Sequence, residues 1–113
     1  MLIVDDCDDD AELVRIEFEL QGVAADCRCV AGRDGAAAAL EAFAPQVVLS
    51  DLNMPGWSGH EVVALVRERL PGVPVVLLSG AYREGEPLPD ADACLLKDDL
   101  ARVPAVVRGL LGR

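Results

Sequence analysis

The feature that most constrains this fold is a regular alternation of short apolar runs with stretches of helical spacing along the whole chain. The apolar runs, which predict strands, cover residues 2–4, 25–30, 47–50, 75–78 and 93–96. The stretches between and after them with helical spacing cover residues 9–20, 35–43 and 58–70 and the C-terminal segment. Strands that alternate with helices predict right-handed crossovers and a parallel sheet covered on both faces. The expected fold class is therefore a doubly wound α/β domain.

Helix boundaries are marked by caps and breakers. Asp9 to Glu12 is similar to a capping box, and Leu13, Ile16 and Leu20 recur at helical spacing in the helix that it opens. Ser58 and Glu61 have capping-box spacing at the start of the third helix. Pro104 predicts that the regular part of the last helix begins near Val103.

One segment departs from the alternation, between Ser79 and Lys97. A fourth crossover helix is expected there, but Gly85, Pro87 and Pro89 oppose regular helix. The sequence predicts a loop or at most a single turn, that is, a degenerate fourth helix.

Length and composition limit the functional classes. A chain of 113 residues fits one domain that buries a core without metal or disulfide cross-links. The four cysteines are expected to act as small hydrophobic residues, because Cys27-Arg28-Cys29 lacks the second ligand pair of a zinc site.

The net charge of −10 disfavours binding to nucleic acid and to anionic membrane surfaces. The longest apolar runs have four or five residues, far fewer than the roughly 20 of a membrane span, and the N-terminus does not resemble a signal peptide. A cytoplasmic protein without direct contact to membrane or nucleic acid is expected.

The main functional signal is that polar residues follow the ends of different predicted strands. These residues are Asp5, Asp6, Asp51, Ser79 and Lys97. Open α/β sheets bind ligands beyond the carboxyl ends of their strands, so these side chains are expected to converge there. Closely packed carboxylates require a counter-charge, and Mg²⁺ binds carboxylates, water and phosphate oxygens.

This combination of side chains suits phosphoryl transfer. Asp51 can act as the nucleophile, because carboxylates form aspartyl phosphates in other enzymes. The Ser79 hydroxyl and the Lys97 ammonium can each hold an oxygen of the transferred phosphoryl group, while the metal holds another.

The same segments resemble the signature motifs of response regulator receiver domains in two-component signalling. The matching segments are Ile3-Val4-Asp5-Asp6, Asp51-Leu52-Asn53-Met54-Pro55-Gly56, Ser79 after its apolar run, and Leu95-Leu96-Lys97. The resemblance covers essentially the whole chain, residues 1–113, as one receiver domain. It implies a five-stranded sheet in the order 2-1-3-4-5.

The resemblance also implies a mechanism and partners. Asp51 would accept phosphate from a phosphohistidine of a sensor histidine kinase or phosphotransfer protein. Asp6 would bind Mg²⁺ directly and Asp5 mainly through water, and Asp51 and the backbone carbonyl of Asn53 would complete the ligand set. Output would pass by contact with a downstream protein target, and the domain would be a monomer or a weak homodimer. Such a domain is a switch that catalyses its own phosphotransfer and slow dephosphorylation rather than a dedicated enzyme.

Departures from the family pattern leave an alternative open. Cys94 stands three residues before the lysine, where the family usually has an aromatic switch residue, and Asp98 replaces the usual proline after it. The segment from Ser79 to Lys97 is also shorter than in the family and lacks its helix pattern. Because of Cys94 and this degenerate fourth helix, a receiver-like binding module that works without phosphorylation is the competing hypothesis. A hydrolase with an aspartyl-phosphate intermediate is disfavoured, because Asn53 stands where a second carboxylate would be needed.

Overall fold

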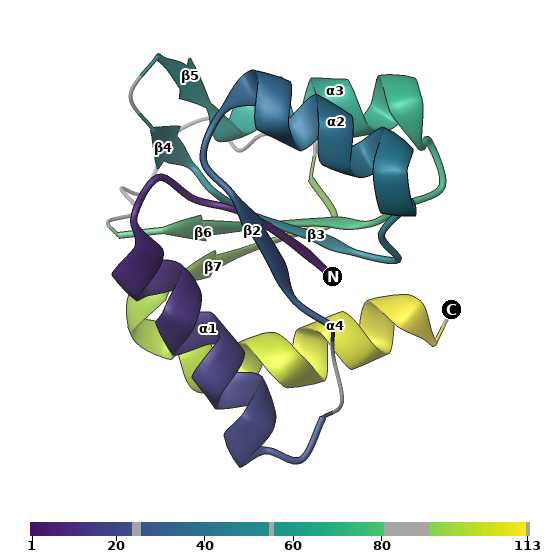
Figure 1. Ribbon diagram of the computed structural model, residues 1–113. Coiled ribbons are helices and arrows are strands. Elements are labelled where there is room, and N and C mark those ends of the chain that lie inside the picture. Colours follow the sequence, from purple (N-terminus) through teal and green to yellow (C-terminus); the bar gives the residue numbers. More distant parts are fainter. Residues whose placement is uncertain (24–25, 55, 81–90, 113) are drawn as a thin grey trace.

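The chain folds as a parallel sheet between two layers of helices (Figure 1). The computed structural model describes residues 1–23, 26–54, 56–80 and 91–112. The strands of the main sheet are β1 (Leu2–Val4), β2 (Arg28–Val30), β3 (Val48–Asp51), β6 (Val75–Ser79) and β7 (Ala93–Leu96). Their order is β2-β1-β3-β6-β7, with every neighbouring pair parallel. This is the order 2-1-3-4-5 in chain sequence, so the predicted fold class is confirmed.

Helices cover both faces of the sheet. They are α1 (Asp8–Leu20), α2 (Arg33–Phe43), α3 (Gly59–Arg69), the 3-10 helix η1 (Lys97–Arg102) and α4 (Val103–Leu111). Helices α2 and α3 lie on one face, and α1 and α4 lie on the other (Figure 1). The last α-helix begins at Val103 with Pro104 in its first turn, as predicted. The expected loop in place of a fourth helix falls on residues 81–90, outside the described residues.

The central strands supply side chains to two separate hydrophobic cores. Along β6, Val75 and Leu77 join the core under α2 and α3, while Val76 and Leu78 join the core under α1 and α4. Successive side chains of a strand point to opposite faces, so a strand buried on both sides needs an unbroken apolar run. This requirement explains why these segments could be recognised in the sequence.

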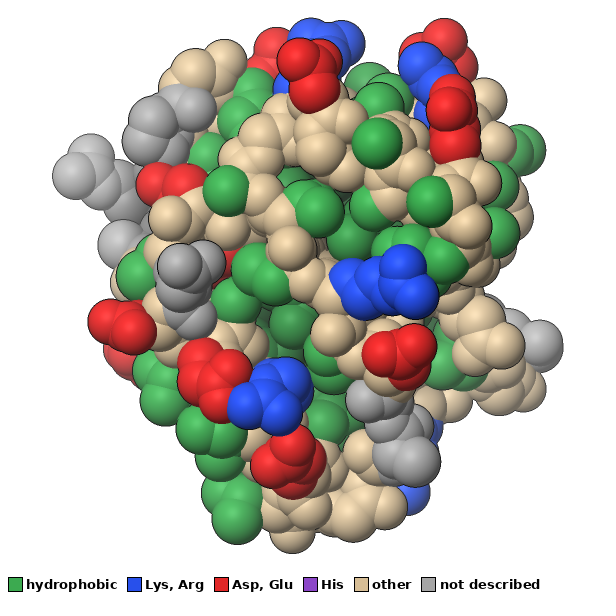
Figure 2. Space-filling model, viewed as in Figure 1, with side chains coloured by type: hydrophobic (Ala, Val, Ile, Leu, Met, Phe, Trp, Pro, Cys, Tyr) green, Lys and Arg blue, Asp and Glu red, His purple; other side chains and the backbone are tan. Residues whose placement is uncertain are grey.

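The buried face of α1 is not the one on which Leu13, Ile16 and Leu20 recur. The buried residues of the helix are Ala11, Val14 and Phe18, whereas the three recurring residues are exposed: Leu13 by 52%, Ile16 by 37% and Leu20 by 76%. Both sets have the same seven-residue spacing and differ by two positions, which is about 200° around a helix. Burial of the larger Phe18 decides between the two faces. Figure 2 shows hydrophobic side chains at the surface over α1, interspersed with acidic and basic ones.

The two predicted capping boxes have different outcomes. Helix α1 begins at Asp8 after Cys7, without a side-chain cap, so the predicted box from Asp9 to Glu12 is wrong. The N–H of Cys7 donates instead to Asp5 Oδ1 at 2.9 Å, which ties the start of the helix to the strand-end carboxylate. At α3 the box is present, with the Ser58 N–H donating to Glu61 Oε2 at 2.9 Å.

Gly59, at the start of α3, packs against the segment that follows Asp51. A Cβ added at Gly59 would lie 3.0 Å from Leu52 Cα and 3.0 Å from Leu77 Cδ2. We expect Gly59→Ala to lower the free energy of unfolding by about 1–3 kcal/mol, because backbone and core must move to admit the methyl group. Urea unfolding measures this loss, with Gly72→Ala as the control, since a Cβ there meets nothing within 4 Å. Equal losses for the two variants would contradict the packing argument.

Candidate functional site

The predicted site residues lie at one edge of the sheet, where the strands end. Asp5 follows β1, and Asp51 and Ser79 are the last residues of β3 and β6. Lys97 follows β7 directly and begins η1. Because β1, β3, β6 and β7 are consecutive neighbours in a parallel sheet, their carboxyl ends bring these residues together.

Three carboxylates form the acidic part of this edge. Asp5, Asp6 and Asp51 each offer a carboxylate oxygen, and these oxygens lie within 4.8 Å of one another. Asp5 and Asp51 are buried, with 3% and 9% of their surface exposed, while Asp6 is exposed. Burial raises the pKa of the Asp5 carboxyl above its ordinary value. The Cys7 N–H and Lys97 oppose this rise in pKa, and the charges of Asp51 and Asp10 add to it.

Lys97 supplies the positive charge. Its Nζ lies 3.2 Å from Asp51 Oδ2, 3.5 Å from Asp5 Oδ2 and 2.6 Å from Asp10 Oδ2. Burial works to lower the pKa of Lys97, but its hydrogen bonds to Asp10 and Asp51 and the charge of Asp5 outweigh burial, so the pKa is raised. Lys97 is therefore a fixed cation beside the Asp51 carboxylate.

Ser79 lies next to this pair in the sheet. Asp51 is in register with Leu78 on β6, and Ser79 is the next residue along the same strand. Its side chain is 1% exposed, and it is in register with Leu96, which immediately precedes Lys97. Ser79 thus ends the strand that lies between β3, which carries Asp51, and β7, which precedes Lys97.

The segment after Asp51 contains an element that the sequence does not predict. The strands β4 (Asn53–Met54) and β5 (Trp57–Ser58) form a short antiparallel ribbon. Two main-chain hydrogen bonds anchor it: the Leu52 N–H donates to Leu78 O at 2.9 Å, and the Gly59 N–H donates to Leu52 O at 2.7 Å. The Asn53 carbonyl therefore belongs to a segment held against β6 and α3. Its role as a metal ligand stays a prediction.

Asp10 is the site residue that sequence reasoning missed. The carboxylate was expected to serve the start of a helix, yet it makes the shortest of the three contacts to Lys97. Only the packing of α1 against η1 brings the two side chains together, and no motif in the sequence encodes that contact.

The sequence matches the model of the response regulator receiver domain family over residues 1–97. The chain belongs to the response regulator receiver domain family.

Solved receiver domains share its whole fold. The structure is similar to that of TrrA from Thermotoga maritima, determined in complex with Mg²⁺ and BeF, with a TM-score of 0.80, 25% identity and 96% of each chain covered. It is also similar to the signal receiver domain of the response regulator NarL from Mycobacterium tuberculosis. That comparison gives a TM-score of 0.74 and 28% identity over 99% of this chain and 95% of that one.

Two curated relatives are longer proteins. The response regulator protein FleR of Pseudomonas aeruginosa is 45% identical over 49 residues, which are 41% of this chain and 10% of FleR. The DNA-binding transcriptional regulator NtrC of Salmonella typhimurium is 32% identical over 88 residues, which are 69% of this chain and 19% of NtrC. The chain therefore spans about a tenth to a fifth of the relatives that it matches.

The donor set of this receiver domain fits a small hard cation. Carboxylate oxygens within 4.8 Å of one another can surround one ion, since Mg²⁺ prefers oxygen ligands at about 2.0–2.1 Å. Among the described residues of this site, Asp5, Asp6, Asp10 and Asp51 outnumber the ammonium of Lys97, so a divalent cation would offset most of the negative charge that remains. Within the described residues, no helix combines the length and the apolar character needed to cross a bilayer.

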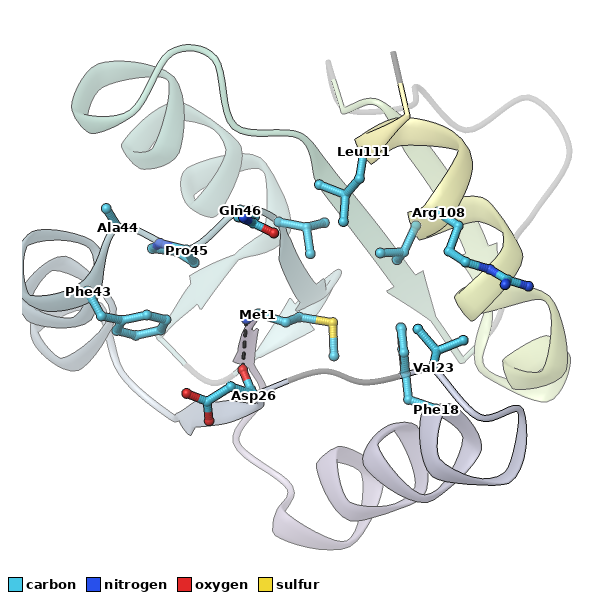
Figure 3. A pocket seen from close by; sticks show the side chains of 12 residues that line it. Met1, Phe18, Val23, Asp26, Phe43, Ala44, Pro45, Gln46, Arg108 and Leu111 are labelled. Carbon is cyan, nitrogen blue, oxygen red and sulfur yellow. Dashed lines mark hydrogen bonds between the residues drawn. The ribbon is translucent and has the colours of Figure 1, made fainter.

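A hydrophobic pocket at the opposite edge of the sheet has different chemistry (Figure 3). Its volume is about 370 Å³, and its lining includes Met1, Phe18, Phe43 and Leu111. The terminal amino group of Met1 donates to the carbonyl of Asp26 at 2.8 Å. This pocket lies where β1 and β3 begin, away from the carboxylates, and the charged side chains among the described residues that line it are Asp26 and Arg108.

Proposed function

We propose that this receiver domain accepts a phosphoryl group on Asp51 in a Mg²⁺-dependent reaction and signals through contact with another protein. The observation that carries the proposal is the position of the Asp51 carboxylate. It lies 3.2 Å from the Lys97 ammonium and shares with Asp5 and Asp6 a cluster of oxygens within 4.8 Å. A nucleophile placed between a cation and a metal-binding set of carboxylates meets the requirements of phosphoryl transfer.

In this mechanism an oxygen of Asp51 attacks the phosphorus of a phosphohistidine donor. The bond from phosphorus to the imidazole nitrogen breaks, and the imidazole leaves with its electron pair and takes up a proton. Lys97 and Ser79 hold two of the phosphoryl oxygens through their ammonium and hydroxyl groups. Asp5, Asp6, Asp51 and the Asn53 carbonyl would hold Mg²⁺, which when bound neutralises charge that develops on the phosphoryl oxygens.

The family implies the donor and the mode of output. A sensor histidine kinase or a phosphotransfer protein supplies the phosphoryl group, and a protein target receives the signal. Residues 1–113 act as one receiver domain, cytoplasmic and either monomeric or weakly dimeric. A net charge of −10 favours a protein target over nucleic acid or an anionic membrane for this segment.

Cys94 supports a second candidate, a receiver-like binding module that works without phosphate. This half-buried residue on β7 packs against the core under α2 and α3, where the family usually has an aromatic switch residue. The two candidates differ in one measurable respect, which is whether Asp51 takes up phosphate.

Intact-mass spectrometry tests this difference. We expect the protein, incubated with acetyl phosphate and Mg²⁺, to gain the mass of one phosphoryl group, and we expect no gain when EDTA removes the metal. Peptide mapping should place the group on Asp51. Complete absence of the phosphorylated species under these conditions, together with no binding of beryllofluoride, would favour the binding-module candidate.

A further inference from the structure

Lys97 has a partner outside the set of residues that the family motifs supply. Its ammonium lies 2.6 Å from Asp10 Oδ2, against 3.2 Å from Asp51 Oδ2. Asp10 sits in the first turn of α1, four residues after Asp6, and therefore approaches Lys97 from a helix rather than from a strand end. The ammonium is shared between the acceptor carboxylate and this helix.

The surroundings of the Asp10–Lys97 pair strengthen it. A recess of about 40 Å³ is lined by both residues together with Asp5 and the apolar Leu13, Val14, Leu78 and Leu100. The Lys97 side chain is 21% exposed and the Asp10 side chain 37% exposed. Apolar walls lower the local dielectric constant, so an ion pair here is stronger than a fully exposed pair of the same length.

A phosphoryl group on Asp51 would compete for the N–H donors of Lys97. The group adds negatively charged oxygens beside an ammonium that already contacts Asp5, Asp10 and Asp51. An ammonium has only three N–H donors, so each donor directed to Asp10 is lost to the phosphoryl oxygens. The Asp10 charge also repels an incoming anion.

We propose that Asp10 is a positioning residue that competes with the phosphoryl group for the Lys97 ammonium and thereby weakens binding of the phosphoryl group at Asp51. The proposal rests on the proposed function, because it concerns the same acceptor site. It adds a regulating contact through which the first turn of α1 sets how readily the site is occupied.

The first test is the affinity for beryllofluoride, a phosphoryl mimic, at saturating Mg²⁺, followed by isothermal titration calorimetry. Asp10→Asn should bind beryllofluoride about three- to tenfold more tightly than wild type, since a half-exposed charged hydrogen bond no longer competes. Asp9→Asn is the matched control. It removes the same charge from the same helical turn, at an exposed residue outside the described ion pairs of Lys97. Asp10→Glu should restore an affinity near wild type.

The direction of the change separates positioning from structural damage. A loosened site would bind beryllofluoride more weakly, so only relief of competition predicts tighter binding in Asp10→Asn. Unchanged or weaker binding in Asp10→Asn, or equal tightening in Asp9→Asn, would overturn the proposal. Absence of beryllofluoride binding by the wild type would instead overturn the proposed function, and this inference with it.

The second test needs neither phosphate nor metal. Urea unfolding of wild type, Asp10→Asn, Lys97→Met and the double variant in EDTA gives the coupling between the two side chains. We expect Asp10→Asn to be less harmful to stability when Lys97 is already absent. If Asp10→Asn changed the free energy of unfolding equally in wild type and in Lys97→Met, the pair would not form in solution. That result would contradict the inference, whatever the outcome of the phosphorylation experiment.

Discussion

Replacing Asp51 by asparagine is expected to abolish phosphorylation of this domain, lowering the rate of phosphoryl uptake by roughly a thousandfold or more. The side chain is nearly the same size, so the buried site at the end of β3 keeps its shape. The amide oxygen, however, carries no negative charge and is a poor nucleophile. Lys97 keeps its contacts with Asp5 and Asp10, so the fold of the variant is expected to persist.

The measurement is intact-mass spectrometry of Asp51→Asn with acetyl phosphate and Mg²⁺. Glu68→Gln is the control, because it removes a charge from the exposed surface of the last turn of α3, far along the chain from the acceptor. The control should accept phosphate at the wild-type rate. A stoichiometric phosphoryl adduct on Asp51→Asn would show that another residue is the acceptor.

Asp51→Asn also removes one of the three clustered carboxylates, so it should weaken Mg²⁺ binding. A ligand that binds only the folded state raises the free energy of unfolding by about 2.7 kcal/mol at a hundred times its dissociation constant. Thermal unfolding with increasing Mg²⁺ therefore reports the affinity of the cluster. We expect the stabilisation of the wild type to begin at lower Mg²⁺ than that of Asp51→Asn, and coincident curves would argue against the cluster as the metal site.

The sheet and the strand-end residues could be predicted because their signals are local and mutually consistent. A central strand such as β6 must be apolar on both faces, and the polar residue that ends it, Ser79, marks the edge where ligands bind. The parallel topology then fixes which strand ends are neighbours. Asp51 and Lys97 come together for that reason, although they lie 46 residues apart in the sequence.

The features that escaped prediction depend on how elements dock. Two stripes of α1 with equal spacing compete for burial, and only contact with the sheet selects the one that contains Phe18. The strands β4 and β5 have two residues each, too few for any periodic pattern. The contact between Asp10 and Lys97 also depends on docking. The two residues lie 87 positions apart in the sequence, and only the packing of α1 against η1 brings their side chains together.

Lys97→Met is expected to destabilise the metal-free protein by about 1–3 kcal/mol at neutral pH, since removing one partner of a partly buried set of ion pairs leaves the other charges uncompensated. Methionine keeps most of the hydrocarbon stem, so the main loss is the positive charge. Asp5, Asp10 and Asp51 would then face one another, with Asp5 almost fully buried. Mg²⁺ should restore part of the lost stability, because it supplies the missing positive charge to the same carboxylates.

The dependence of this loss on pH has a definite sign. Burial and neighbouring carboxylates already raise the pKa of Asp5, and loss of Lys97 removes a contribution that lowers it. The folded variant therefore binds protons more tightly than the unfolded chain, and its stability falls as pH rises from the unfolded pKa through the raised folded pKa. Urea unfolding at about pH 5 and about pH 8 should give a smaller deficit at the lower pH.

Arg102→Met, which removes an equal charge from an exposed pair with Asp99 on η1, is the control. A deficit that is equal at both pH values and insensitive to Mg²⁺ would mean that Lys97 contributes by packing rather than by its charge.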